Sequence, residues 1–161
     1  YLDLVNRVCA IYGGQVSICD NYDIYILFDE PRQNMTHCVN ALCAAQFFLG
    51  LYKHCNLQCH NCDQPTLNIQ IVVHYGNQAT VELTTQKAAT LSKQLCIDSL
   101  IISAEVAYHP ELQQRLLESD HCTLLNNGAF KLTRLSADYQ DLLDQQVQHF
   151  SQSTHHSQGH A

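Results

Sequence analysis

Residues 54–62, "HCNLQCHNC", concentrate side chains that can carry out chemistry. Three cysteines and two histidines fall within nine positions, and Cys55, Cys59 and Cys62 follow a Cys-x3-Cys-x2-Cys spacing. Thiolates are soft ligands for zinc and for iron–sulfur clusters, and imidazole is a common partner in zinc sites. The pattern therefore predicts a metal site at these three cysteines, with either histidine of the stretch as a fourth ligand for zinc.

The surroundings of this motif limit what it can mean. The cysteine spacing resembles the cluster-binding loop of radical-SAM enzymes, but that loop follows the first strand of a large barrel. Here a predicted loop over 54–66 follows a predicted helix, and too few residues remain to build a barrel. Structural zinc sites usually join two ligand pairs from separate elements. Three interpretations stay open: a surface loop whose cysteines pack on the domain, a zinc site, and a thiol redox site.

The whole chain has the composition of one globular domain. Its 161 residues are 46% hydrophobic and 14% charged, which excludes a disordered tail and a coiled coil. The formal net charge of −7 argues against nucleic acid and against an anionic membrane surface as partners. No apolar run approaches the roughly 20 residues of a membrane-spanning helix, so we expect no insertion of this segment into a membrane.

The cysteine count and the ends of the chain add further expectations. Nine cysteines, an odd number that falls mostly in apolar segments, make a poor disulfide framework and favour a reducing, cytoplasmic environment. The chain begins inside a predicted helix, which indicates a segment of a longer protein. We expect one domain over residues 1–150 and a disordered tail over 151–161, where the sequence has no apolar pattern.

Hydrophobic periodicity predicts the elements that would position the cysteine motif. Helices are predicted over 1–12, 34–55, 84–95, 104–118 and 137–150. Strands are predicted over 15–19, 24–28, 67–76 and 99–103, followed by a hairpin over 122–135. With one further strand before residue 1, the first half would read βαββαβ. We therefore predict an α+β fold with a ferredoxin-like sheet, helices on one face, and its first strand outside this chain.

Five stretches in order carry a resemblance to a known family. They are "YLDLVNRVCAIYGGQV", "YILFDEP", "CVNALCAAQFFLGL", "IQIVVHYG" and "LIISAEVAYHPEL", which together span roughly residues 1–135. In this order they resemble the class III nucleotide cyclase catalytic domain, the family of adenylate and guanylate cyclases. The resemblance implies a cyclase-like fold and a dimer with two sites at its interface. In active members, two aspartates hold Mg²⁺ or Mn²⁺ ions that act on ATP or GTP.

The matching positions of this chain lack the residues that such chemistry needs. The first metal aspartate would precede residue 1, and the second falls on Tyr22, which cannot replace a carboxylate as a Mg²⁺ ligand. The purine-reading lysine falls on Ile18. The catalytic asparagine and arginine fall on Thr90 and Gln94, and a neutral glutamine cannot stabilise the charge of a triphosphate. We therefore expect neither catalytic nor cofactor-binding residues in this chain.

Together these features favour a non-catalytic regulatory or dimerisation domain, a pseudoenzyme within a larger bacterial signalling or membrane-linked protein. It would be cytoplasmic, free or as the soluble part of a membrane-attached protein. It would pair with a second copy or an intramolecular partner domain through an apolar face on the predicted hairpin. One alternative is a divergent nucleotidyl cyclase or nucleotide-binding enzyme that uses Mg²⁺ or Mn²⁺ with ATP and holds metal through Asp20 or Asp23. A second alternative is a metal or redox sensor, with zinc at residues 54–62.

Overall fold

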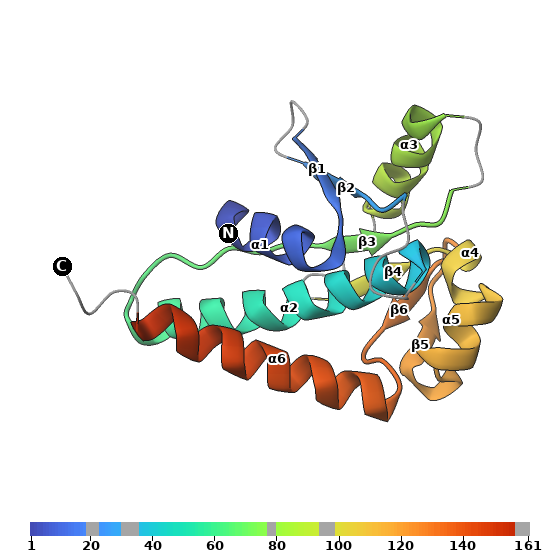
Figure 1. Cartoon of the computed structure of the whole chain (residues 1–161). Coiled ribbons are helices and arrows are strands. Elements are labelled where there is room, and N and C mark those ends of the chain that lie inside the picture. The colour runs from blue at the N-terminus through green and yellow to red at the C-terminus, as the bar shows by residue number, and fades with distance from the viewer. Residues whose placement is uncertain (19–22, 30–35, 77–79, 94–98, 157–161) are drawn as a thin grey trace.

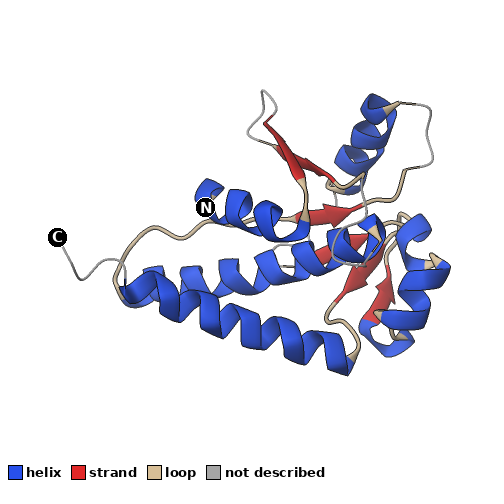
Figure 2. Ribbon diagram, in the orientation of Figure 1, coloured by secondary structure: helices blue, strands red, loops and turns tan. Residues whose placement is uncertain are grey.

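The structure is a computed structural model that describes residues 1–18, 23–29, 36–76, 80–93 and 99–156. The described residues form an α+β fold in which helices pack against a small mixed sheet, while a separate two-stranded hairpin projects beside it (Figures 1 and 2). This arrangement confirms the predicted α+β class. Among the described helices, none combines the length and apolar character that crossing a membrane requires.

Helices and strands are interspersed along the whole described chain (Figure 2). The helices are α1 (Leu2–Tyr12), α2 (His37–Asn61), α3 (Val81–Leu91), α4 (Ala104–Ala107), α5 (Pro110–Arg115), the 3₁₀ helix η1 (Ser119–His121) and α6 (Ala137–His156). The strands are β1 (Gln15–Ile18), β2 (Ile24–Leu27), β3 (Ile71–Val73), β4 (Leu100–Ile102), β5 (Cys122–Leu124) and β6 (Phe130–Leu132).

The described strands form two separate sheets rather than one continuous sheet. The larger sheet has the order β3-β4-β6-β5, with β3 and β4 parallel and the other pairs antiparallel. Strand β4 lies in its interior and is fully buried, as its continuous apolar run predicts. Strands β1 and β2 form an antiparallel hairpin in which Val16 is paired with Ile26. The described strands therefore do not form the single sheet that was predicted, and its ferredoxin-like arrangement stays a prediction.

Helix α2 forms the centre of the core. Its apolar residues are buried on several sides, and Val39, Leu42 and Tyr52 are each 0% exposed. The helix contacts α1 and α6 along its length, and it also packs on β3 and β4. Phe47, in the middle of α2, lies between the rings of Tyr12 and Phe150, at centroid distances of 6.0 and 5.9 Å. Aromatic packing thus joins the first, second and last helices.

The predicted loop over 54–66 is wrong in its first half, because α2 continues through Asn61. The sequence has no proline or glycine between Gly50 and Pro65, so nothing in the backbone stops the helix earlier. The helix ends where Asp63 takes a left-handed conformation, with φ of 52°. The N–H of Gln64 then donates to the carbonyl of Cys59 at 2.8 Å, which is a Schellman motif.

Two other predicted boundaries also differ from the structure. The predicted helix over 104–118 is divided into α4 and α5, because Pro110 cannot donate a backbone hydrogen bond and therefore begins a new helix. The last helix runs through His156 instead of ending at residue 150, so the first part of the predicted tail is helical. The remaining residues of that tail, 157–161, lie outside the described residues.

Replacing Phe47 by alanine tests the aromatic packing of Phe47 against Tyr12 and Phe150. Phe47→Ala removes a ring that is only 2% exposed. We expect the free energy of unfolding in urea to fall by about 3–5 kcal/mol, because transfer and cavity costs add. The matched control on the same helix is Leu57→Ala, since Leu57 is 60% exposed and its truncation should change stability by about 0.5 kcal/mol or less. Equal losses for the two variants would contradict the assigned packing.

Candidate functional site

The β1–β2 hairpin exposes apolar side chains on both of its faces. Ile24 is 41% exposed, Ile26 is 38% exposed and Leu27 is 36% exposed. Because side chains alternate along a strand, Ile24 and Ile26 share one face and Leu27 belongs to the other. Figure 1 shows the hairpin projecting from the helical body on the side away from α6. The hairpin is therefore an apolar surface element, in the position where the sequence predicts an apolar face.

Gly14 lets this hairpin fold back on the end of α1. A Cβ atom at Gly14 would lie 2.5 Å from Cγ2 of Ile26 and 2.8 Å from the ring of Phe28, closer than side chains tolerate. Phe28 is partly buried and packs against the core, so it anchors the base of the hairpin. Ile24 lies four residues before Phe28 on the same face and is exposed. The base of the hairpin is thus fixed, while its outer part presents apolar surface.

A polar cluster lies at the carboxyl ends of β3 and β4. His74 directly follows β3 and Ser103 directly follows β4, and the two parallel strands are adjacent. His74 Nδ1 lies 2.9 Å from Ser103 Oγ and 3.7 Å from Oε2 of Glu105. Glu105 also forms an ion pair with Lys87 of α3. Parallel pairing therefore brings together residues that are widely separated in the sequence.

The geometry of this cluster does not suit nucleophilic catalysis. In a serine–histidine–acid arrangement, the serine and the acid face opposite nitrogens of the imidazole ring. Here Ser103 and Glu105 both face Nδ1 of His74. Ser103 is 1% exposed, and its hydroxyl caps α4 by accepting a hydrogen bond from the N–H of Val106 at 3.4 Å. The cluster therefore positions the ends of two strands and the start of α4.

The ion pair between Lys87 and Glu105 ties α3 to this cluster. The Lys87 side chain is 43% exposed and that of Glu105 is 32% exposed. Burial acts to raise the pKa of Glu105, but hydrogen bonds from Lys87 and from the backbone outweigh it and lower this pKa to about 2. Because the pair is half exposed, water screens it, and a pair of this kind contributes about 0–1 kcal/mol. The pair is therefore a weak tether between α3 and α4.

The structure places the predicted cysteine site on one face of a helix end. Cys55 and Cys59 lie one turn apart on α2, and Cys62 is its C-terminal capping residue. Cys55 and Cys59 are half-buried, whereas Cys62 is exposed. Burial, and then the neighbouring Cys59 thiol, raise the pKa of the Cys55 thiol, so Cys55 is a neutral thiol at neutral pH. His54 directly precedes Cys55 on α2, and its Nε2 lies 2.9 Å from Nε2 of Gln58, one turn further along the helix.

The described structure does not gather these cysteines around one point, as a zinc centre requires. Within the described parts of the chain, no group of three or more histidine, cysteine, aspartate or glutamate side chains is arranged to hold a metal ion. One helix face spreads its cysteines along the axis, whereas a tetrahedral site needs ligands that converge from several directions. The motif therefore forms a row of thiols in this structure.

The positions matched to a cyclase site are not brought into one cleft in the described residues. Thr90 is exposed on α3, and its hydroxyl donates to the carbonyl of Gln86 at 2.9 Å. Ile18 ends β1, where it is paired with Ile24. Asp23 is exposed at the start of the second hairpin strand. The interpretations that involve Tyr22, Asp20 and Gln94 fall outside the described residues.

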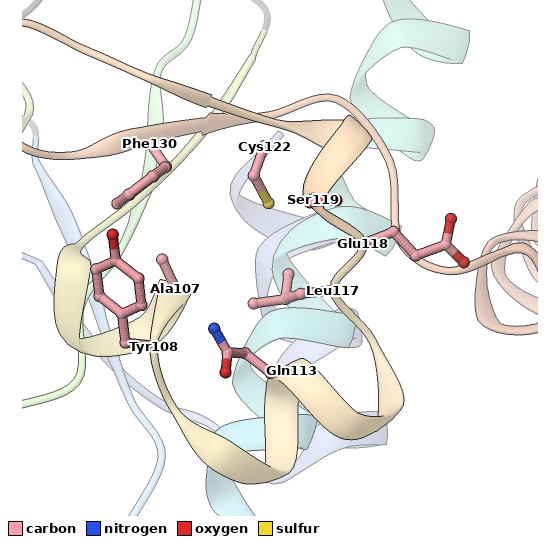
Figure 3. A pocket seen from close by; sticks show the side chains of 8 residues that line it. All are labelled: Ala107, Tyr108, Gln113, Leu117, Glu118, Ser119, Cys122 and Phe130. Carbon is pink, nitrogen blue, oxygen red and sulfur yellow. The ribbon is translucent and has the colours of Figure 1, made fainter.

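A pocket that the sequence did not indicate lies between the α4–α5 segment and the β5–β6 strands (Figure 3). Its volume is about 370 Å³. The rings of Tyr108 and Phe130 meet edge to face at 5.6 Å on one side, and Figure 3 shows Gln113 and Cys122 pointing inward. Burial raises the pKa of the Cys122 thiol, which keeps it neutral. Its lining holds a glutamate and neither lysine nor arginine, so it does not favour a phosphate ligand.

Comparisons with known proteins were made for the whole chain. No protein-family description matches it, and no curated protein matches it at a significant level.

The low pKa of Glu105 predicts how the tether responds to pH. A carboxyl whose pKa is depressed in the folded state stabilises the fold above its unfolded pKa, near 4.5, and this contribution disappears as the pH falls toward 2. We expect Glu105→Gln to lower the free energy of unfolding slightly at pH 7. The difference from the unmodified protein should shrink in urea titrations between pH 4.5 and pH 2. A difference that grows as the pH falls would contradict the ion pair. Asp138→Asn, on α6, is the control.

Proposed function

We propose that this chain is a non-catalytic regulatory or dimerisation domain with a class III nucleotide cyclase-like fold, and that the β1–β2 hairpin is its contact surface. The observation that carries the proposal is the exposure of Ile24, Ile26 and Leu27 on one projecting element. Exposed apolar side chains that gather on one element mark protein–protein contact sites, whereas scattered ones do not. An isolated two-stranded hairpin is also marginally stable, so a partner that covers it adds stability.

The order of the strands supports a cyclase-like arrangement. In the larger sheet β3 is an edge strand, and β2 is an edge strand of the hairpin, among the strands that the structure describes. Helix α2 connects β2 to β3. A strand that precedes residue 1 and pairs with both edges would join the two sheets into one, which is the sheet that the resemblance implies. This pairing would also cover the exposed edges of β2 and β3, which could otherwise pair with a strand of another molecule.

The non-catalytic part of the proposal rests on the chemistry of the described residues. Asp23 and Asp29 are the aspartates described on the hairpin segment, both are exposed, and no metal-binding group includes either of them. A two-metal phosphoryl-transfer site needs converging carboxylates and a cation for the triphosphate. Thr90 carries no charge, and Lys87 is already paired with Glu105. The domain would then act within a larger bacterial signalling or membrane-linked protein, on its cytoplasmic side.

Sedimentation equilibrium tests the contact surface. We expect the protein to form a dimer, and Ile24→Asp to raise the dimer dissociation constant at least about tenfold, because a carboxylate would be buried in an apolar contact. Leu142→Asp is the matched control, since Leu142 is 56% exposed on α6, away from the hairpin. Circular dichroism should show that both variants are folded. A monomeric wild type at high concentration, or equal effects of the two substitutions, would contradict the proposed surface.

An activity assay tests the absence of catalysis. We expect no cyclic nucleotide when the purified chain is incubated with Mn²⁺ and ATP or GTP, because the cation and carboxylates of such a site are lacking in the described residues. An active class III cyclase serves as the positive control. Metal-dependent formation of cyclic AMP would establish the alternative, a divergent nucleotidyl cyclase.

The second candidate function is a metal or redox sensor, and it rests on the row of thiols at the end of α2. A bound metal ion would have to draw Cys55, Cys59 and Cys62 together, because the described structure does not gather them. Protein purified without oxygen would be analysed for zinc and iron beside Cys59→Ser, with Cys122→Ser as the control on a distant strand. Zinc at one equivalent that is lost only in Cys59→Ser would establish a metal site at Cys55, Cys59 and Cys62. Metal-free protein, with equal stability in both variants, would contradict a metal site at these cysteines.

A further inference from the structure

A second pocket lies over the carboxyl end of β4, where α3, α4 and the β5–β6 turn meet. Its volume is about 260 Å³. Sheets that contain adjacent parallel strands often bind ligands outside the carboxyl ends of those strands. The residues that line this pocket are Lys87, Leu91, Ser103, Ala104, Glu105, Asn127, Gly128 and Ala129. It is separate from the hairpin surface and from the cysteine row.

Two opposite charges line this pocket and are paired with each other. Lys87 reaches it from α3 and Glu105 from α4, and the pair joins the two helices. Helix α3 has no buried residue, so this pair is prominent among the contacts that hold it to the body. The half-exposed pair is weak, and a ligand that offers one charge to each partner can replace it without leaving either charge unmatched.

The other walls restrict the size and polarity of a ligand. Leu91, Ala104 and Ala129 provide the apolar part of its lining. The Ser103 hydroxyl lies at the buried end of the pocket. Asn127 is held in place because its Oδ1 accepts a hydrogen bond from the N–H of Ala129 at 3.0 Å. The lining as a whole has one positive and one negative group, which disfavours both phosphates and polyamines.

We propose that this pocket binds the zwitterion of a free α-amino acid with a small side chain. The ligand carboxylate would accept hydrogen bonds from Nζ of Lys87, and its ammonium group would donate to the carboxylate of Glu105. Its side chain would contact Leu91 and Ala104. Binding would bridge α3 and α4 through the ligand in place of their direct ion pair. This site goes beyond the proposed dimerisation, because it uses neither the hairpin nor a second copy.

Isothermal titration calorimetry with the full chain tests this proposal, with L-alanine as the probe. We expect saturable binding with a Kd of about 1 mM or tighter, which a ligand of this size can reach. Acetate and methylamine carry the two charges separately and should each bind about tenfold more weakly or not at all. Lys87→Met and Glu105→Gln should each weaken alanine binding at least about tenfold. Lys93→Met is the matched control, because Lys93 is exposed just after α3 and does not line the pocket.

A further variant separates binding from the stability of α3. Ala104→Leu keeps both charges and fills part of the pocket, so it should abolish alanine binding while the circular dichroism spectrum is unchanged. The proposal is overturned if alanine shows no saturable heat, if acetate binds as tightly as alanine, or if Ala104→Leu binds like the wild type. Sedimentation of the same samples reports dimerisation separately, so either proposal can fail without the other.

Discussion

Helix α2 carries apolar side chains around most of its circumference between residues 38 and 52, so it must be enclosed on several sides at once. Helices α1 and α6 cover it along its length, and strands β3 and β4 supply another side. Each large side chain that becomes fully buried there contributes about 1.5–3 kcal/mol. These elements are placed by the need to cover this one helix, and Phe47 packs between Tyr12 and Phe150 as part of the same core.

This packing leaves the hairpin and α3 at the margin of the core. The hairpin is anchored at its base by Phe28, and its outer part exposes Ile24. Helix α3 has no buried residue and is tied to α4 by the pair between Lys87 and Glu105. Elements with few buried contacts open and move at low free-energy cost, and binding surfaces are commonly found on them. The two proposed binding surfaces of this chain therefore lie on its least buried elements.

The polar cluster at the strand ends connects the sheet with α3 and α4. His74, Ser103 and Glu105 are buried or half-buried, and each is hydrogen-bonded or paired within the cluster. Such pairing is required because a buried polar group without a partner is costly. The cluster lies where β3 and β4 end and where α4 begins, and the ion pair of Glu105 with Lys87 connects it to α3. A ligand or partner that moves α3 would act directly on this cluster.

The sequence by itself determined the α+β class, the approximate position of most elements, and the hairpin with its apolar face, because these depend on local periodicity and on turn residues such as Gly13. It could not determine the end of α2, where Asp63 rather than glycine takes the left-handed conformation. The sequence therefore predicted a loop at residues 54–62, whereas Cys55 and Cys59 lie on α2 and Cys62 caps its C-terminus. Tertiary structure alone brought His74 next to Ser103, because that contact arises from the pairing of strands far apart in the chain. It also created both pockets, since their walls come from several elements whose mutual placement is decided by burial of the core rather than by any local pattern.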